Sequence, residues 1–459
     1  MEQISTDDFT KSKSEFRKKL LSIAVPVALQ NLMQALVGAS DALMLGRLSQ
    51  NAVAAVSLAN QIAFVMSLFT ACVLGGAGTL IAQYQGKGDT RTIRNLMSMS
   101  IRLCALISFL FFAAAFFIPE QLMTIYTSEK ELIRIGAFYL RIVSWSYLFS
   151  GLSQSYLLVM KISGRARKSA LISTMTVFID MFADLFLIYG LAGIPKLGVA
   201  GCAISTVVVE ACALAVCIAD SHGRGHIHPD RASLIYHSAE LTRDYSKVAL
   251  PILASSLAWG LGFSMHTMIM GHLGSDAVAA AAVVSVVQEL VTCLCRGLSS
   301  GASIMTGQLL GQNRLKEAKV CGAKFCRIAI GCGFFNAAVL LVIGPAAGMF
   351  FILTERAGSY LLRMMLVLAV YLFAYSLNTI ITCGVFPAGG DTLYDAVSVM
   401  LSMWCFSLPL GLLGTFVFHW PVMAVYILVM ADEVIKLPWL YPRYKKYLWV
   451  KNLTRDIPA

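Results

Sequence analysis

The chain contains twelve long apolar stretches, and these constrain its fold more than any other feature. Each is long enough to cross the hydrocarbon core of a bilayer, which takes about 20 residues in a helix. Charged residues make up only 13% of the 459 positions, too few to cover the surface of a soluble protein of this size. The sequence therefore predicts an all-α integral membrane protein with helices at 20–46, 53–85, 95–118, 132–160, 169–191, 197–219, 247–271, 277–310, 328–351, 359–387, 393–418 and 420–437.

The basic residues predict how these helices are oriented. With the amino terminus in the cytoplasm, the cytoplasmic segments hold 27 of the 36 lysines and arginines, and the loops on the opposite side hold five. Such an excess is the positive-inside pattern of membrane proteins. We therefore expect a multi-pass protein of the cell (cytoplasmic) membrane with both termini in the cytoplasm. The net charge of +11 is then a topology signal, and it predicts no nucleic-acid partner.

The sequence repeats itself at a spacing of 225 residues. Pro26 falls on Pro251, and the "AVAA" at 52–55 falls on the same letters at 277–280. Six helices separate the copies, so both enter the membrane in the same direction, which is a parallel repeat. We expect two six-helix bundles around a central cavity. The predicted organisation is a cytoplasmic segment 1–19, a first lobe 20–219, a cytoplasmic linker 220–246, a second lobe 247–437 and a basic tail 438–459.

The twelve cysteines, Cys202 among them, nearly all lie inside apolar stretches, and none forms a spaced pair in an external loop. We interpret them as small buried apolar residues. No arrangement of nucleophile and base, and no metal-ligand spacing, is recognisable in the sequence. We therefore expect neither an enzyme nor a cofactor.

Acidic residues inside the predicted spans are the main candidates for function, because a charge in hydrocarbon is costly. Asp41 lies in the first span, and Asp180 and Asp184 lie four residues apart in the fifth. This spacing puts them on one helix face, about 6 Å apart. Two such carboxylates cannot both stay ionised without a counter-ion, so the pair retains a proton or binds a cation. That chemistry suits ion-coupled transport.

Other polar residues in the spans have separate interpretations. Glu289 and Arg296 are seven apart on one helix, which predicts a structural ion pair, and Glu210 is also interpreted as structural. Pro26 removes a backbone hydrogen bond and permits the first helix to bend. Our hypothesis is that protonation or ion loading near Asp41 favours either the bent or the straight form of this helix and so changes access to the cavity. The candidates for lining a substrate cavity are Asn31, Gln34, Gln154, Met175 and His266, the last being the repeat counterpart of Asp41.

Several motifs together carry a resemblance to a known family. They are "AVPVALQNLMQALVGASDALMLGRL", its second copy "ALPILASSLAWGLGFSMHTMIMGHLG", and "DMFADLFLIYG" before "LGVAGCAIST". With these, essentially the whole chain resembles the multidrug and toxic compound extrusion (MATE) transporters, within the superfamily that includes polysaccharide and lipid-precursor flippases. The resemblance to its DinF-like branch implies an ion site of Asp41, Asp180 and Asp184, with Thr206 as the hydroxyl contributor. Asp180 departs from the pattern, since that position is usually Asn.

The resemblance implies a secondary antiporter that exports organic, cationic or amphipathic compounds in exchange for H⁺ or Na⁺. No metal is expected beyond a Na⁺ at the ion-coupling residues. The partners that we expect are small organic substrates and membrane lipid, and we expect a monomer. The alternative is a flippase for a lipid-linked or polysaccharide precursor. Few basic residues lie within the spans to meet a phosphate, and this favours the antiporter.

Overall fold

The structure is a computed structural model that describes residues 6–190, 193, 195–223, 225–236, 238–350 and 354–455. The predicted amino-terminal segment, linker and tail therefore each lie partly outside the described residues. The chain divides into two compact units. We call Gln30–Ala249 the N-unit, and Met1–Leu29 together with Leu250–Asp456 the C-unit. Helices form both, and no strand occurs within the described ranges.

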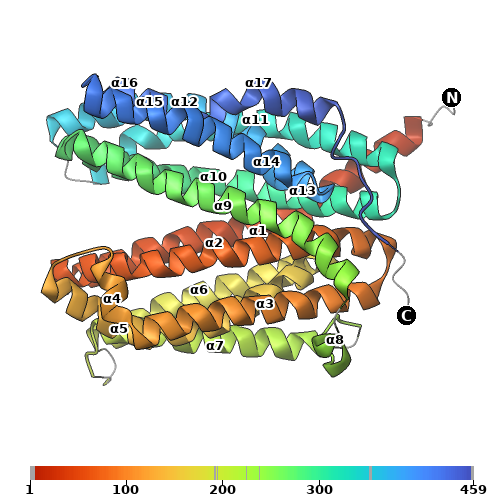
Figure 1. Cartoon of the computed structure of the whole chain (residues 1–459), viewed down its shortest axis with the longest axis horizontal. Helices are drawn as coiled ribbons and strands as arrows, with labels where there is room; N and C mark the ends of the chain where they lie inside the picture. Colours follow the sequence, from red (N-terminus) through yellow and green to blue (C-terminus); the bar gives the residue numbers. More distant parts are fainter. Residues whose placement is uncertain are drawn as a thin grey trace. The chain divides into compact units, whose positions relative to one another are not determined.

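The N-unit is built from long helices that succeed one another along the chain with short connections (Figure 1). Gly88 and Gly164, with φ of 81° and 85°, occupy the left-handed region between consecutive helices, which glycine adopts without a steric penalty. The helices are α1 (Thr6–Gly46, from Gln30 onward), α2 (Gln50–Lys87), α3 (Thr90–Phe117), α4 (Pro119–Thr124), α5 (Lys130–Met160), α6 (Ala166–Tyr189), α7 (Val199–Ser221), α8 (Arg231–Ile235) and the start of α9 (Ala239–His272).

The C-unit continues from α9 and contains three stretches of π-helical hydrogen bonding, at Ile380–Val385, Met400–Ser407 and Leu413–Val417. These stretches join shorter helical pieces into longer rods. The remaining helices are α10 (Ser275–Gly311), α11 (Leu315–Phe350), α12 (Glu355–Thr379), α13 (Phe386–Ala388), α14 (Thr392–Val399), α15 (Leu408–Leu412), α16 (Val422–Val429) and α17 (Asp432–Lys445).

Ten helical stretches among the described residues are long and apolar enough to cross a membrane. One of them, Lys130–Tyr189, contains both α5 and α6. The predicted last span, 420–437, is divided between α16 and α17, each shorter than a full span. The difference between twelve predicted helices and ten stretches arises from these two places. The protein is an all-α, multi-pass membrane protein.

The two repeat-related first helices are each divided between the units, close to a proline. The division falls after Leu29 in α1 and after Ala249 in α9, near Pro26 and Pro251. The first part of α1 belongs to the C-unit, where a Cβ added at Gly297 of α10 would lie 2.4 Å from the Ala24 carbonyl oxygen. The helix backbones therefore approach closely there, as small residues permit in membrane proteins.

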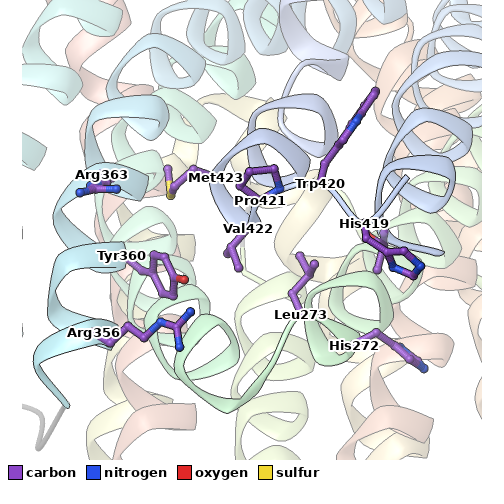
Figure 2. Close-up of a pocket in the computed structure, with 11 residues that line it drawn as sticks. His272, Leu273, Arg356, Tyr360, Arg363, His419, Trp420, Pro421, Val422 and Met423 are labelled. Atoms are coloured by element: carbon purple, nitrogen blue, oxygen red, sulfur yellow. The ribbon is translucent and has the colours of Figure 1, made fainter. Parts of the chain in front are cut away.

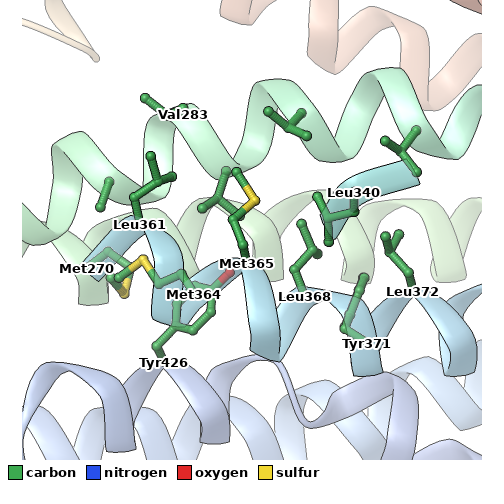
Figure 3. Close-up of a cluster of buried hydrophobic side chains, with 14 of the residues drawn as sticks. Met270, Val283, Leu340, Leu361, Met364, Met365, Leu368, Tyr371, Leu372 and Tyr426 are labelled. Carbon is green, nitrogen blue, oxygen red and sulfur yellow. The ribbon is translucent and has the colours of Figure 1, made fainter. Parts of the chain in front are cut away.

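Each unit has its own apolar core. In the C-unit, α10, α11 and α12 contribute Val283, Leu340 and Leu368 to a cluster that also contains Tyr426 of α16 (Figure 3). In the N-unit, Val56, Leu140 and Ile188 belong to the corresponding cluster. Large apolar side chains also cover outward helix faces, as lipid-facing surfaces require, among them Leu106, Phe109, Leu110, Phe182 and Val370.

Candidate ion site in the N-unit

Two carboxylates of α6 form the centre of the candidate site. Asp180 and Asp184 are buried, with 9% and 0% of their surface exposed. Both point inward because the apolar residues between them, such as Phe182, take the outward face of the same helix. The Ser205 hydroxyl of α7 donates a hydrogen bond to Oδ1 of Asp184. A serine in the second turn of α7 therefore holds the deeper carboxylate.

Glycine brings α7 close enough to α6 for this contact. A Cβ at Gly201 would lie 2.6 Å from the Leu187 carbonyl oxygen, so a larger residue there would force the helices apart. The connection is tightened by the Leu197 amide, which donates to the same Leu187 carbonyl at 3.0 Å. Gly198, at φ 57°, begins α7 in a conformation that favours glycine. The "LGVAGCAIST" motif thus builds a close helix pair beside the carboxylates.

Asp41 of α1 completes the cluster. One ligand atom each from Asp41, Asp184 and Cys202 lies within 4.8 Å of the other two. Asp41 is half-buried, whereas Asp184 and Cys202 are buried. The Tyr189 hydroxyl of α6 donates to the Met44 carbonyl at 2.8 Å and ties α1 to α6 at this level. The structure therefore brings together the first-span and fifth-span aspartates.

These carboxylates are incompletely satisfied. Within the described part of the chain, Oδ1 of Asp41, Oδ1 of Asp180 and Oδ2 of Asp184 are buried and have no hydrogen-bond partner. No ion pair joins any of the three to a described basic side chain, and their charged neighbours are other carboxylates. Buried charges of one sign so close together require a proton or a cation to be stable. The arrangement can therefore hold and release a positive charge.

The C-unit has a buried acidic cluster of a different kind. Asp432 and Glu433 at the start of α17 are both buried, and Nζ of Lys436 lies 2.6 Å from Oε1 of Glu433 and 3.7 Å from Oδ2 of Asp432. Asn378 of α12 donates to the other oxygen of Glu433 at 2.7 Å. A lysine of the chain thus supplies the counter-charge here, and the N-unit cluster has no such lysine among its described neighbours.

Asp395 is an acidic residue in a predicted span of the C-unit that the sequence interpretation does not include. Asp395 lies on α14, in the span expected at 393–418, and accepts a hydrogen bond from Ser255 of α9 at 2.9 Å. Its position three residues after the helix begins could have been read from the sequence as within the span. Asp395 also lies near enough to Lys436 for its charge to act there. It therefore belongs with the compensated C-unit cluster.

The remaining predicted site residues lie elsewhere. Thr206 is half-buried and donates to the Cys202 carbonyl at 3.0 Å, so the hydroxyl on Asp184 is that of the neighbouring Ser205. The ion-coupling role of Thr206 stays a prediction. His266 is buried in the C-unit with Nε2 unpartnered among the described residues. In the N-unit, the polar candidates Asn31, Gln154 and Gln34 range from half-buried to exposed, and Met175 is exposed.

The predicted ion pair of α10 is present, with Nη2 of Arg296 lying 2.9 Å from Oε1 of Glu289. Two cavities of the C-unit are lined by none of the predicted site residues. One, of about 480 Å³, is lined by Arg356 and Arg363 of α12 and by His272 and His419 (Figure 2). The other, of about 700 Å³, lies between α11 and α17 and is mostly apolar.

The helices, the repeat and the buried carboxylates together define a polytopic membrane transporter. The family MatE matches residues 26–186 and 251–413, and the chain belongs to this family, whose members are transporters. The two matched ranges begin at Pro26 and Pro251, which confirms the internal repeat of 225 residues. The chain is therefore a transporter rather than an enzyme.

The relatives are distant but match over nearly the whole chain. The uncharacterised transporter YisQ of Bacillus subtilis is 22% identical over 94% of this chain and 95% of its own length. The multidrug resistance protein PmpM of Pseudomonas aeruginosa is 23% identical over 86% of this chain and 83% of its own length. A variant of the Vibrio cholerae MATE transporter VcmN has a similar fold, with a TM-score of 0.88 and 17% identity over 96% of this chain and 99% of that one.

Proposed function

We propose that this chain is a multidrug efflux antiporter that exports organic, cationic or amphipathic compounds in exchange for H⁺ or Na⁺. The observation that carries the proposal is the N-unit cluster, in which Asp41 and Asp184 lie within 4.8 Å and keep unpaired oxygens. Multidrug resistance relatives such as PmpM support the substrate class. Asp180 extends the site along α6, and Thr206 remains a proposed contributor.

The site supports coupling because its charge is not compensated by the protein. When a proton or Na⁺ binds, the repulsion between the carboxylates falls, so the loaded and empty states differ in energy. A helix that carries one of these carboxylates can then favour different conformations when the ion is bound and when it is absent. Asp41 lies on α1, whose interior contains Pro26, and we propose that α1 bends there as the ion binds. Asn31, Gln34, Gln154, Met175 and His266 are proposed to line the substrate cavity.

Efflux from proteoliposomes with separately imposed pH and Na⁺ gradients tests the proposal. Asp41→Asn and Asp184→Asn are expected to abolish gradient-driven efflux while the purified proteins stay monodisperse. Glu129→Gln is the control, because Glu129 is exposed in the turn before α5. The gradient that drives the wild-type protein identifies the coupling ion. Undiminished coupled efflux in both aspartate variants would overturn the assignment of the ion site.

The flippase alternative is favoured by one observation. The cavity in Figure 2 has Arg356 and Arg363 on one side and Trp420 on the other, and no carboxylate is among the described residues that line it. The guanidinium groups of the two arginines suit a phosphate. If the physiological cargo is a lipid-linked phosphate, Arg356→Ala with Arg363→Ala will stop its transfer between leaflets and leave export of an organic cation intact. If the proposed function is right, export of the cation will instead depend on Asp41 and Asp184.

We also propose that the protein is a monomer of the cytoplasmic membrane with both termini in the cytoplasm. The distribution of 27 against five basic residues supports this orientation. The linker 220–246 and the tail 438–459 then lie in the cytoplasm, between and after the proposed lobes 20–219 and 247–437. Membrane-impermeant labelling of single cysteines placed in both segments checks the orientation. Light scattering of the purified protein checks the oligomeric state.

A further inference from the structure

Cys202 is a buried cysteine that lies beside two carboxylates of the N-unit cluster. Its Sγ is one of the three ligand atoms that lie within 4.8 Å of one another, the other two being oxygens of Asp41 and Asp184. Cys202 is 1% exposed and sits on α7 directly after Gly201, at the closest approach of α7 to α6. The thiol therefore faces the carboxylates by construction of the helix pair.

The deeper carboxylate is already oriented as a ligand. Ser205 holds Oδ1 of Asp184, and the buried Oδ2 has no partner in the described part of the chain. A hydrogen-bonded carboxylate with one free oxygen is the arrangement found where an outer partner orients a metal ligand. Asp41, being half-buried, supplies the second carboxylate and the less enclosed side of the cluster. Asp184 is fully buried, and its unpaired oxygen lacks a donor among the described residues unless a proton or a cation lies between it and Asp41.

The mixed donor set selects the kind of ion. Hard cations such as Mg²⁺ and Ca²⁺ are bound by oxygens, whereas a thiolate favours Zn²⁺ and softer ions. Zinc binds sulfur at about 2.3 Å and carboxylate oxygen at about 2.0–2.2 Å, so tetrahedral ligands lie roughly 3.5 Å apart. The present spread of at most 4.8 Å needs a closure of about 1 Å, which side-chain rotation can supply.

We propose that Asp41, Asp184 and Cys202 form a binding site for a thiophilic divalent cation such as Zn²⁺ or Cd²⁺, and that the bound ion blocks efflux. Binding forms a metal–sulfur bond and releases the thiol proton to solvent, so that the thiolate and the two carboxylates together carry the negative charge that the divalent ion offsets. The proposal that the metal binds depends only on the cluster of Asp41, Asp184 and Cys202. The inhibitory part rests on the proposed function, since the metal would occupy the coupling carboxylates.

Metal binding is tested on the purified full-length protein with Cd²⁺ alone as the probe. The wild-type protein is expected to bind one Cd²⁺ that Cys202→Ser and Cys202→Ala do not bind, with loss of its cadmium–thiolate ultraviolet absorption. Cys212→Ser is the matched control, because Cys212 lies on the same helix but is exposed. Asp184→Asn is expected to weaken binding at least tenfold. The site is refuted if both Cys202 variants, shown to be folded by thermal melting, bind Cd²⁺ like the wild type.

Inhibition is measured as the fraction of each variant's own efflux that Cd²⁺ removes. Wild type and Cys212→Ser are expected to be inhibited, and the Cys202 variants to be at least tenfold less sensitive. Equal sensitivity of all four proteins to Cd²⁺ would overturn the inhibitory part. The two proposals fail separately: binding without any effect of Asp41→Asn and Asp184→Asn on efflux refutes the antiporter site, whereas carboxylate-dependent efflux without Cys202-dependent binding refutes the metal site.

Discussion

The Ser205 hydroxyl donates a hydrogen bond to Oδ1 of Asp184, while Oδ2 of the same carboxylate has no partner in the described part of the chain. One oxygen is thus fixed and the other is available to an ion. The donor makes the carboxylate rigid without neutralising it. A basic side chain in the place of Ser205 would cancel the charge on which coupling depends.

Removing this donor is therefore expected to impair transport. Ser205→Ala should lower gradient-driven efflux about tenfold, because a hydrogen bond to a charged group contributes roughly 1.5–3 kcal/mol. Ser205→Thr keeps a hydroxyl and should recover most of the rate. Ser221→Ala removes a hydroxyl from the end of the same helix, where it bonds the Ile218 carbonyl, and serves as the control. Equal efflux rates in Ser205→Ala and the wild type would contradict the role of Ser205.

Removing the positive charge of Lys436 from the C-unit cluster is expected to lower the stability of the protein. Lys436→Met would leave Asp432 and Glu433 buried without their counter-charge, and breaking a buried ion pair in this way costs about 3–5 kcal/mol. We expect a lower melting temperature in detergent. Adding Asp432→Asn and Glu433→Gln to Lys436→Met should restore much of the stability, since the two acids that the lysine contacts are then neutral. A single variant as stable as the wild type would show that Lys436 does not compensate these acids.

The close contact of α6 and α7 is expected to tolerate no added methyl group. Gly201→Ala places a Cβ 2.6 Å from the Leu187 carbonyl oxygen and should destabilise the protein by about 1–3 kcal/mol. Efflux should fall as well, because the same helix pair positions Ser205. Gly331→Ala on α11 meets nothing within 4 Å and should be neutral or stabilising by up to about 1 kcal/mol. Thermal melting of both variants compares the two sites directly.

The connection after α7 is expected to respond to acid. Hydrogen bonds from Ser233 and the ion pair with Arg94 at 2.8 Å lower the pKa of Asp230 to about 2. Because the folded pKa lies below the usual 3.8, the stabilisation is complete above about pH 4 and is lost as the pH falls toward 2. Amide hydrogen exchange of α8 should accelerate only in that window. Asp230→Asn keeps the helix cap and should remove the pH dependence.

Much of the fold was predictable because spans in a bilayer must be long, apolar and helical. The predicted span at 393–418 coincides with α14, α15 and the π-helical turns that link them. The division of the last span at Met430 and Ala431 was not predicted, because no glycine or proline marks it, although Asp432 and Glu433, which follow it, are the acidic residues that favour the start of a helix. Hydropathy also cannot show that the first part of α1 packs with the C-unit, since this depends on contacts more than 250 residues away, such as Gly297 with Ala24.

The candidate site was predictable in its carboxylates and not in its other members. Asp41, Asp180 and Asp184 stand out because charge in a span is costly. Cys202 has no such signal, since a buried cysteine is ordinary in an apolar helix, and only the close packing at Gly201 turns it toward the acids. Ser205 and Thr206 are adjacent hydroxyls, and their helical phase decides which one reaches Asp184.

The division of α1 has a consequence for how the chain is made. Residues before Gln30 leave the ribosome first, yet their partners lie in α10 and α11: Lys19 donates to Gln308 at 2.8 Å, and Phe16 packs edge-on against Phe325. This segment of α1 therefore waits through the synthesis of nearly 300 residues before its packing partners exist. Packing of the C-unit can therefore be completed only after the first part of α1 and the much later α10 and α11 have all been synthesised.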